Sequence, residues 1–148
     1  MVVSYDMYIE SFLDKVKEYD FLSMDDYSRT KLVEGYMKRA CAQFNKICEY
    51  DIISCDDENR VFIEEIADED IDEIVDIVSE GMIVQWLKPY MYKQENYENL
   101  LNTTDYSGYS PANLLERTTE AYNMCKMDYT NKMREYSFSH GDLTDLHI

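Results

Sequence analysis

IDEIVDIVSEGMIVQWLKP, residues 71–89, is the stretch that decides the fold. Apolar residues recur in it every three or four positions, which predicts one face of an amphipathic helix. A second apolar face widens the buried surface until the last turns are apolar nearly all round. We therefore expect a helix that is central in the fold or touches another subunit. The first face contains Ile71, Ile74, Val75, Val78, Met82 and Trp86, and the second contains Ile77, Ile83, Val84 and Leu87.

Both ends of this helix carry recognisable signals. The acids at residues 68–70 suit a helix start, because carboxylates stabilise the positive end of the helix dipole. Pro89 lacks the amide hydrogen that would bond the Gln85 carbonyl, and its ring clashes with that turn. The sequence thus predicts a kink or an end near Lys88, followed by a short helical piece at 96–101.

Three further helices are expected from apolar periodicity and from the shortage of Gly and Pro. The first covers about residues 4–18 and the second about 24–50. The last begins at Ser110 and Pro111, because a Ser side chain accepts a first-turn amide hydrogen and Pro in the first helical position loses only an unpaired amide. It runs without Gly or Pro to about Tyr136.

The predicted fold is mainly α, with four to five helices, a long C-terminal helix and a flexible tail. We expect one domain over residues 1–136 and a tail over 137–148 that a partner orders. Residues 61–63 are compatible with a short extended piece or an irregular segment. The opening residues lack the apolar core of a signal peptide, and no apolar run approaches the roughly 20 residues of a membrane span, so we expect a cytoplasmic, soluble protein.

The net charge of −17 is concentrated in the first half of the chain. Residues 1–80 contain 22 acids and 8 bases, a net charge of −14, whereas residues 81–148 have a net charge of −3. The electrostatic field of these acids repels nucleic-acid phosphates, and the sequence lacks the stripe of Lys and Arg residues that a DNA-binding protein needs. A surface that DNA slides past, or a partner with a basic face, remains compatible with the charge.

No motif predicts an enzyme, a cofactor or a metal site. The four cysteines form no Cys-x-x-Cys pair, and the two histidines lie far from them, so zinc-ligand spacing is absent. An EF-hand loop counted from Asp68 fails, because Glu73 and Ser79 stand at its sixth and twelfth positions. We interpret the acidic run at residues 56–80 as a solvated helix face. His140 beside Asp142 could be imagined as an acid–base pair, but a tail does not preorganise one.

The fourteen tyrosines form an unusual feature, and several lie just before the last helix. Tyr is frequent in protein interfaces because it combines a rigid apolar ring with a polar tip, but it also fills cores. Both interpretations stay open for residues 90–109. The stripe along the last helix packs on other helices of the chain or forms a seam with a neighbouring copy; it comprises Leu115, Thr118, Tyr122, Cys125, Tyr129, Met133 and Tyr136.

Three segments carry a family resemblance: GMIVQWLKPYM at 81–91, DYSGYSPANLLERT at 105–118 and YSFSHGDLTDL at 136–146. In these segments the chain resembles the head–tail connector, or adaptor, proteins of tailed phages that infect Gram-positive bacteria. The likeness extends over most of the chain from about Tyr19 onward. Its motifs are a Trp-Leu-x-Pro sequence, a Ser-Pro helix start and an aromatic-His-Gly-Asp-Leu tail.

The resemblance implies a helical structural protein in the virion neck. Such a protein assembles into a ring, with twelve copies expected, beneath the portal protein, and its other face receives the next neck, stopper or tail-completion protein. DNA passes through the lumen without specific binding, and no membrane is involved. We expect the subunit or partner interface to include Trp86, Tyr106, Tyr109, Tyr122, Tyr129, Tyr136, Phe138, Leu143 and Leu146.

A different class of function also fits a small, strongly acidic chain. An inhibitor that mimics DNA could occupy the basic groove of a host nuclease or polymerase. Such a mimic arrays its carboxylates over one continuous face, whereas here they are concentrated in one half and interleaved with apolar stripes. The connector is therefore the leading hypothesis, and the DNA mimic is the alternative.

Overall fold

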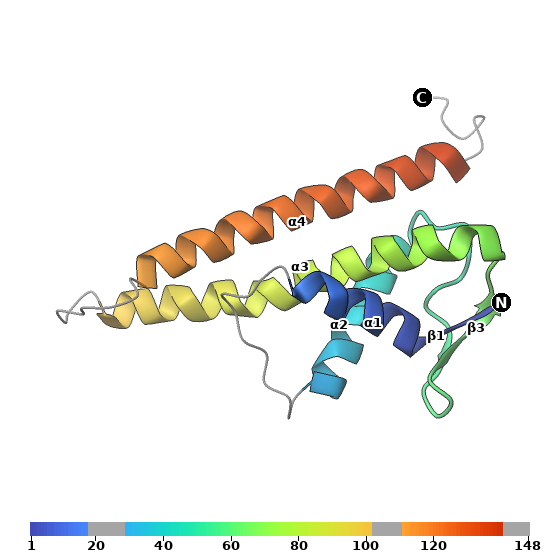
Figure 1. Cartoon of the computed structure of the whole chain (residues 1–148), viewed down its shortest axis with the longest axis horizontal. Helices are drawn as coiled ribbons and strands as arrows, with labels where there is room; N and C mark the ends of the chain where they lie inside the picture. Colours follow the sequence, from blue (N-terminus) through green and yellow to red (C-terminus); the bar gives the residue numbers. More distant parts are fainter. Residues whose placement is uncertain (18–28, 102–110, 141–148) are drawn as a thin grey trace.

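The computed structural model describes residues 1–17, 29–101 and 111–140 (Figure 1). This part of the chain is mainly helical, as predicted, and also contains a small three-stranded sheet. No helix within it combines the length and the hydropathy that crossing a membrane requires. The elements are β1 (Val2–Ser4), α1 (Tyr5–Val16), α2 (Arg29–Phe44), β2 (Cys55–Asp56), β3 (Val61–Glu65), α3 (Asp68–Leu101) and α4 (Pro111–His140).

Helices α3 and α4 form a long antiparallel pair (Figure 1). With 34 and 30 residues, they measure about 51 Å and 45 Å at a rise of about 1.5 Å per residue. The start of α3 and the end of α4 lie together near the sheet. Helices α1 and α2 lie beside the first half of α3, whereas its second half and the first half of α4 extend beyond them.

The core surrounds the first half of α3. Both of its predicted apolar faces are buried, apart from Val75, which is half-buried, because α1 and α2 contact this helix as well as α4. The Trp86 ring meets the Phe12 ring of α1 edge to face, with centroids 6.2 Å apart. The prediction of a central helix is therefore confirmed.

A glycine sets the closest approach of the helices. A Cβ atom placed on Gly81 would lie 2.6 Å from Cζ of Tyr129 on α4 and 2.9 Å from Cβ of Ala40 on α2. The Tyr129 hydroxyl continues across the gap and donates a hydrogen bond of 2.9 Å to the Ala40 carbonyl. Since Tyr129 is only 3% exposed, this bond joins α4 to α2 inside the core.

The sheet, which the sequence did not predict, fixes the start of α1. Its strands are antiparallel in the order β1-β3-β2. The Tyr5 amide donates to the carbonyl of Arg60, a residue with a positive φ of 57° in the β2–β3 turn. The Phe62 ring of β3 then packs on Tyr5 and Tyr8, with centroids 5.2 and 5.3 Å away. Strand β1 has only three residues, too few for a period-two pattern to be visible.

Helix α2 is shorter than predicted. It ends at Phe44, so the prediction that it continues to residue 50 is wrong, and the predicted start at 24 lies outside the described residues. The Asn45 side chain accepts a hydrogen bond from the Ile52 amide and directs the chain away from the helix axis. Ile47, which continued the apolar period, is 41% exposed.

Helices α3 and α4 are longer than predicted. Of the two alternatives predicted near Lys88, a kink or an end, the end is wrong, because α3 continues through Pro89. The piece expected at 96–101 is the last part of this helix. Proline costs a helix about 3 kcal/mol, which packing along α4 offsets. Helix α4 begins at Pro111, as predicted, but ends at His140 rather than Tyr136.

Gly81→Ala is expected to lower the free energy of unfolding by about 1–3 kcal/mol, because the added methyl group overpacks the three-helix contact. Gly35→Ala is the matched control. It lies within α2, and an added Cβ there meets no atom of the described residues within 4 Å, so its expected effect is a gain of up to about 1 kcal/mol. Urea unfolding measures both. Equal effects of the two substitutions would contradict the close-approach interpretation.

Tyr8→Phe is expected to preserve or raise stability by up to about 1 kcal/mol. The Tyr8 hydroxyl is fully buried, and no group in the described ranges hydrogen-bonds it. Tyr5→Phe is the control, because its hydroxyl donates a 2.6 Å bond to Asp57, and its loss should cost about 1 kcal/mol. Thermal unfolding of both variants provides the comparison, and a Tyr8→Phe protein less stable than Tyr5→Phe would refute the prediction.

Candidate functional site

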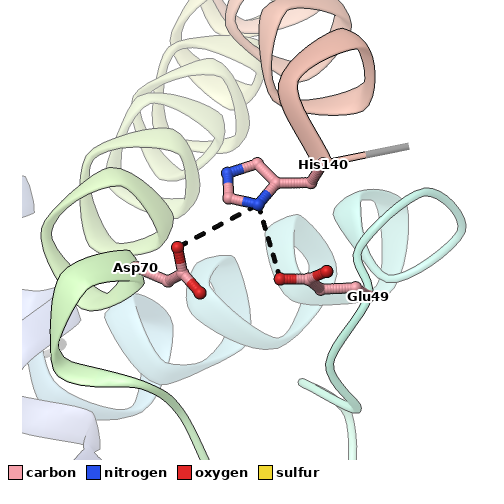
Figure 2. Close-up of side chains that lie close together, drawn as sticks. All are labelled: Glu49, Asp70 and His140. Atoms are coloured by element: carbon pink, nitrogen blue, oxygen red, sulfur yellow. Dashed lines mark ion pairs between the residues drawn. The ribbon is translucent and has the colours of Figure 1, made fainter. Parts of the chain in front are cut away.

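His140 lies at a junction of three segments (Figure 2). It is the last residue of α4, and its ring points between Asp70 in the first turn of α3 and Glu49 in the turn that follows α2. The antiparallel pairing of α3 and α4 produces this arrangement, because it places the end of one helix beside the start of the other. We call Glu49, Asp70, Glu73 and His140 the His140 cluster.

Both nitrogens of the His140 ring face carboxylates. Nδ1 lies 3.4 Å from Glu49 Oε1 and 4.0 Å from Asp70 Oδ1, and Nε2 lies 3.0 Å from Glu73 Oε2. Each of Glu49, Asp70 and His140 offers one donor atom, and these atoms all lie within 4.8 Å of one another. The arrangement therefore presents one nitrogen and two oxygen donors to the same small volume.

Neighbouring aromatic residues hold the cluster in place. The Tyr136 ring stacks on the His140 ring, with centroids 4.2 Å apart and planes 20° from parallel. The Tyr136 hydroxyl accepts a bond of 3.4 Å from the Glu49 amide. On the other side, the Tyr50 hydroxyl donates a 2.7 Å bond to Asp70 Oδ2, which leaves Oδ1 directed toward the histidine.

The electrostatics of the cluster favour a positive charge. Burial lowers the pKa of His140, but the hydrogen bond to Glu73 and the charges of Glu73, Asp70 and Glu49 outweigh burial and raise it above its ordinary value. The Asp70 and His140 side chains are only 14% and 19% exposed, so solvent screens them less than surface charges. The cluster can accept a proton on the ring or a cation between the ring and the carboxylates.

A second charged group connects α1, α3 and α4. Lys15 of α1 lies 2.7 Å from Asp76 and 2.9 Å from Glu80, both on α3. Lys132 of α4 approaches the same two carboxylates at 2.8 and 3.5 Å. These lysines balance the acids, and we assign them a structural role. The interpretation of the acidic run at residues 56–80 as a solvated face is therefore wrong for Glu80 and Asp70, whose side chains are 12% and 14% exposed.

Asp76→Asn is expected to lower stability by about 0.5–1 kcal/mol at neutral pH, because half-exposed ion pairs contribute little. Burial raises the pKa of Asp76, but the bonds from Lys132 and Lys15 hold it below its ordinary 3.8. The contribution is therefore present above pH 3.8 and is lost as the pH falls through the folded-state pKa. Urea unfolding at several pH values measures it. Asp14→Asn, whose pair with Lys17 is exposed, should change nothing, and a pH-independent Asp76→Asn effect would contradict the ion-pair role.

The predicted interface residues fall into different environments. Three of them pack inside the chain and fill its core, which corrects their assignment to an interface: Trp86, Tyr129 and Tyr136 are 1%, 3% and 0% exposed. Tyr122 is half-buried on α4, whereas Phe138 is 69% exposed. The remaining four, Tyr106, Tyr109, Leu143 and Leu146, lie outside the described residues.

The His140 cluster was not predicted from the sequence. Its four members come from three segments, and no ligand spacing marks them. The prediction that His140 belongs to the tail is wrong, because this residue ends α4. Asp142, with which an acid–base pair was rejected, lies outside the described residues. A usable signal was the four-residue step from Tyr136 to His140, which extends the apolar stripe of α4 by about one turn.

No protein-family model, curated protein or solved structure matches the chain. Function must therefore be inferred from the resemblance described above and from the arrangement of the side chains.

Proposed function

We propose that the chain is a head–tail connector of a tailed phage, a structural protein of the virion neck rather than an enzyme. Copies of the chain form a ring, expected to contain twelve subunits, beneath the portal protein, and the ring receives the next neck, stopper or tail-completion protein. DNA passes through its lumen without specific binding. The proposal starts from the resemblance of residues 81–91, 105–118 and 136–146 to connector proteins.

The observation that supports it best is an exposed apolar surface on α4. Met124, Met127 and Phe138 are 61%, 59% and 69% exposed. At about 100° per residue they fall within about 60° of one another around the helix. Tyr129 and Tyr136 lie on the opposite side and pack into the core. We call the three exposed residues the outer α4 face. Met124 and Met127 are neighbours, and Phe138 lies 11 residues, or about 16 Å, further along the same face. Exposed apolar residues on one face of a helix are compatible with a protein interaction site.

The distribution of the acids favours a connector over a DNA mimic. A mimic needs free carboxylates at phosphate-like spacing over one surface. Here many are paired with lysine or arginine within the chain: Asp6 and Glu34 with Arg60, Asp57 with Lys38, and Asp76 and Glu80 with Lys15 and Lys132. Such pairing lowers the field that would attract a basic groove.

Light scattering during size exclusion is the direct test of the proposal. The mass of the protein is measured alone and after mixing with the preassembled portal ring encoded in the same genome. We expect a large complex of defined stoichiometry with the portal. A chain that stays monomeric beside the portal ring, and instead binds a nuclease tightly, would overturn the connector proposal in favour of the inhibitor.

Substitution of the outer α4 face should weaken that complex without unfolding the chain. The triple variant Met124→Ser, Met127→Ser and Phe138→Ser removes exposed apolar area only, so its far-ultraviolet circular dichroism should match the parent. Ile63→Ser is the control, because Ile63 is 64% exposed but lies on β3. The expected result is at least tenfold weaker binding to the portal ring for the triple variant and an unchanged affinity for Ile63→Ser. Equal affinities would exclude this face as the contact.

A further inference from the structure

We propose that Glu49, Asp70 and His140 form a binding site for a divalent transition-metal ion of the zinc type. The ion would join the end of α4 to the start of α3 and to the turn after α2 (Figure 2). This inference is independent of the connector proposal, because it concerns how one chain is held together. It rests on donor spacing, on supporting contacts and on charge.

The spacing of the donor atoms fits a shared ion better than direct hydrogen bonds. Hydrogen bonds between nitrogen and oxygen measure about 2.7–3.2 Å. His140 Nδ1 instead lies 3.4 Å from Glu49 Oε1 and 4.0 Å from Asp70 Oδ1. Two donors that each bind a tetrahedral zinc ion at about 2.1 Å lie about 3.4 Å apart. The three donor atoms lie within 4.8 Å of one another, so the Glu49 and Asp70 carboxylates must both shift inward, by up to about 1 Å, to bind one ion together with His140.

The donor types also suit this class of ion. A neutral imidazole nitrogen is a ligand for zinc and similar transition metals, and carboxylate oxygens complete such sites. One nitrogen and two oxygens give three protein ligands, which leaves a fourth tetrahedral position for water. The Glu49 side chain is 43% exposed, so the site is open to solvent on that side.

Supporting contacts orient two of the three ligands, His140 and Asp70, as in established metal sites. Nε2 of His140 lies 3.0 Å from Glu73, and donation of its hydrogen to that carboxylate leaves the Nδ1 lone pair facing Glu49 and Asp70. Tyr50 occupies the other oxygen of Asp70 at 2.7 Å. The stacked Tyr136 ring holds the imidazole plane. These are contacts that metal ligands receive from their surroundings.

The uncompensated negative charge of the cluster favours the binding of a cation. Three carboxylates surround a single imidazole, so the cluster with a neutral ring has three negative charges and no lysine or arginine among its described ion pairs. The Lys15 and Lys132 pairs, by contrast, neutralise Asp76 and Glu80 directly. A divalent ion would reduce the excess at the His140 cluster to one negative charge and stabilise the folded chain.

Isothermal titration of the full chain with Zn²⁺ tests the site. We expect one ion per chain and a higher melting temperature in its presence. His140→Gln and Asp70→Asn should each abolish this binding. Glu73→Gln, which alters only the orienting contact, should weaken it by about 10- to 100-fold. Asp76→Asn is the matched control, because it changes an α3 carboxylate outside the cluster and should bind as the parent does.

The outcomes separate the site from other zinc ligands. Circular dichroism checks that each variant is folded. Asp70→Asn removes the charge of the ligand but keeps the shape of the side chain, so a loss of binding would not reflect unfolding. Binding that survives both His140→Gln and Asp70→Asn would place the ion elsewhere, for example on cysteine thiols, and would overturn the proposal. The absence of stoichiometric binding to the folded parent chain would overturn it as well.

Discussion

Three helices meet at Gly81 with no room for a side chain, and the rest of the fold depends on that contact. This close approach lets the Tyr129 ring of α4 lie against Gly81 of α3, so that its hydroxyl donates a hydrogen bond to the Ala40 carbonyl of α2. Only glycine allows this close approach of the helix backbones, because any side chain at residue 81 would hold the three helices further apart. The long α3–α4 pair thereby keeps a fixed position against α2, and the Lys15, Lys132 and His140 contacts follow from that position.

The parts of the fold that the sequence predicts are those with a local physical cause. The two apolar faces of residues 71–87 require burial on both sides, and the structure supplies α1, α2 and α4. The Ser-Pro signal places the start of α4 correctly at Pro111. Strand β1 depends on a partner distant in sequence, so no local pattern could reveal it. At Pro89 the local pattern allowed either a kink or an end, and it could not show that α3 continues.

The candidate site is harder to predict for the same reason. Helical spacing of Trp86, Tyr129 and Tyr136 is identical for a residue of the core and for a residue of an interface, and only the packing distinguishes them. Phe138, which we expected at an interface, is exposed. The sequence could indicate this exposure, because Phe138 does not fall on the buried stripe of α4. The His140 cluster combines residues from three segments, and its existence follows from the helix pairing rather than from any motif.

The uneven support of the α3–α4 pair has a mechanical consequence. Its base is held by α1 and α2, whereas its other end projects beyond them (Figure 1). Twenty residues separate Gly81 from Leu101, a span of about 30 Å along the helix. A tilt of about 10° at the glycine contact therefore moves the tip by about 5 Å, given that rise per residue. Because the helix pair extends so far beyond the Gly81 contact, a small change of packing at the base corresponds to a much larger displacement of the far end.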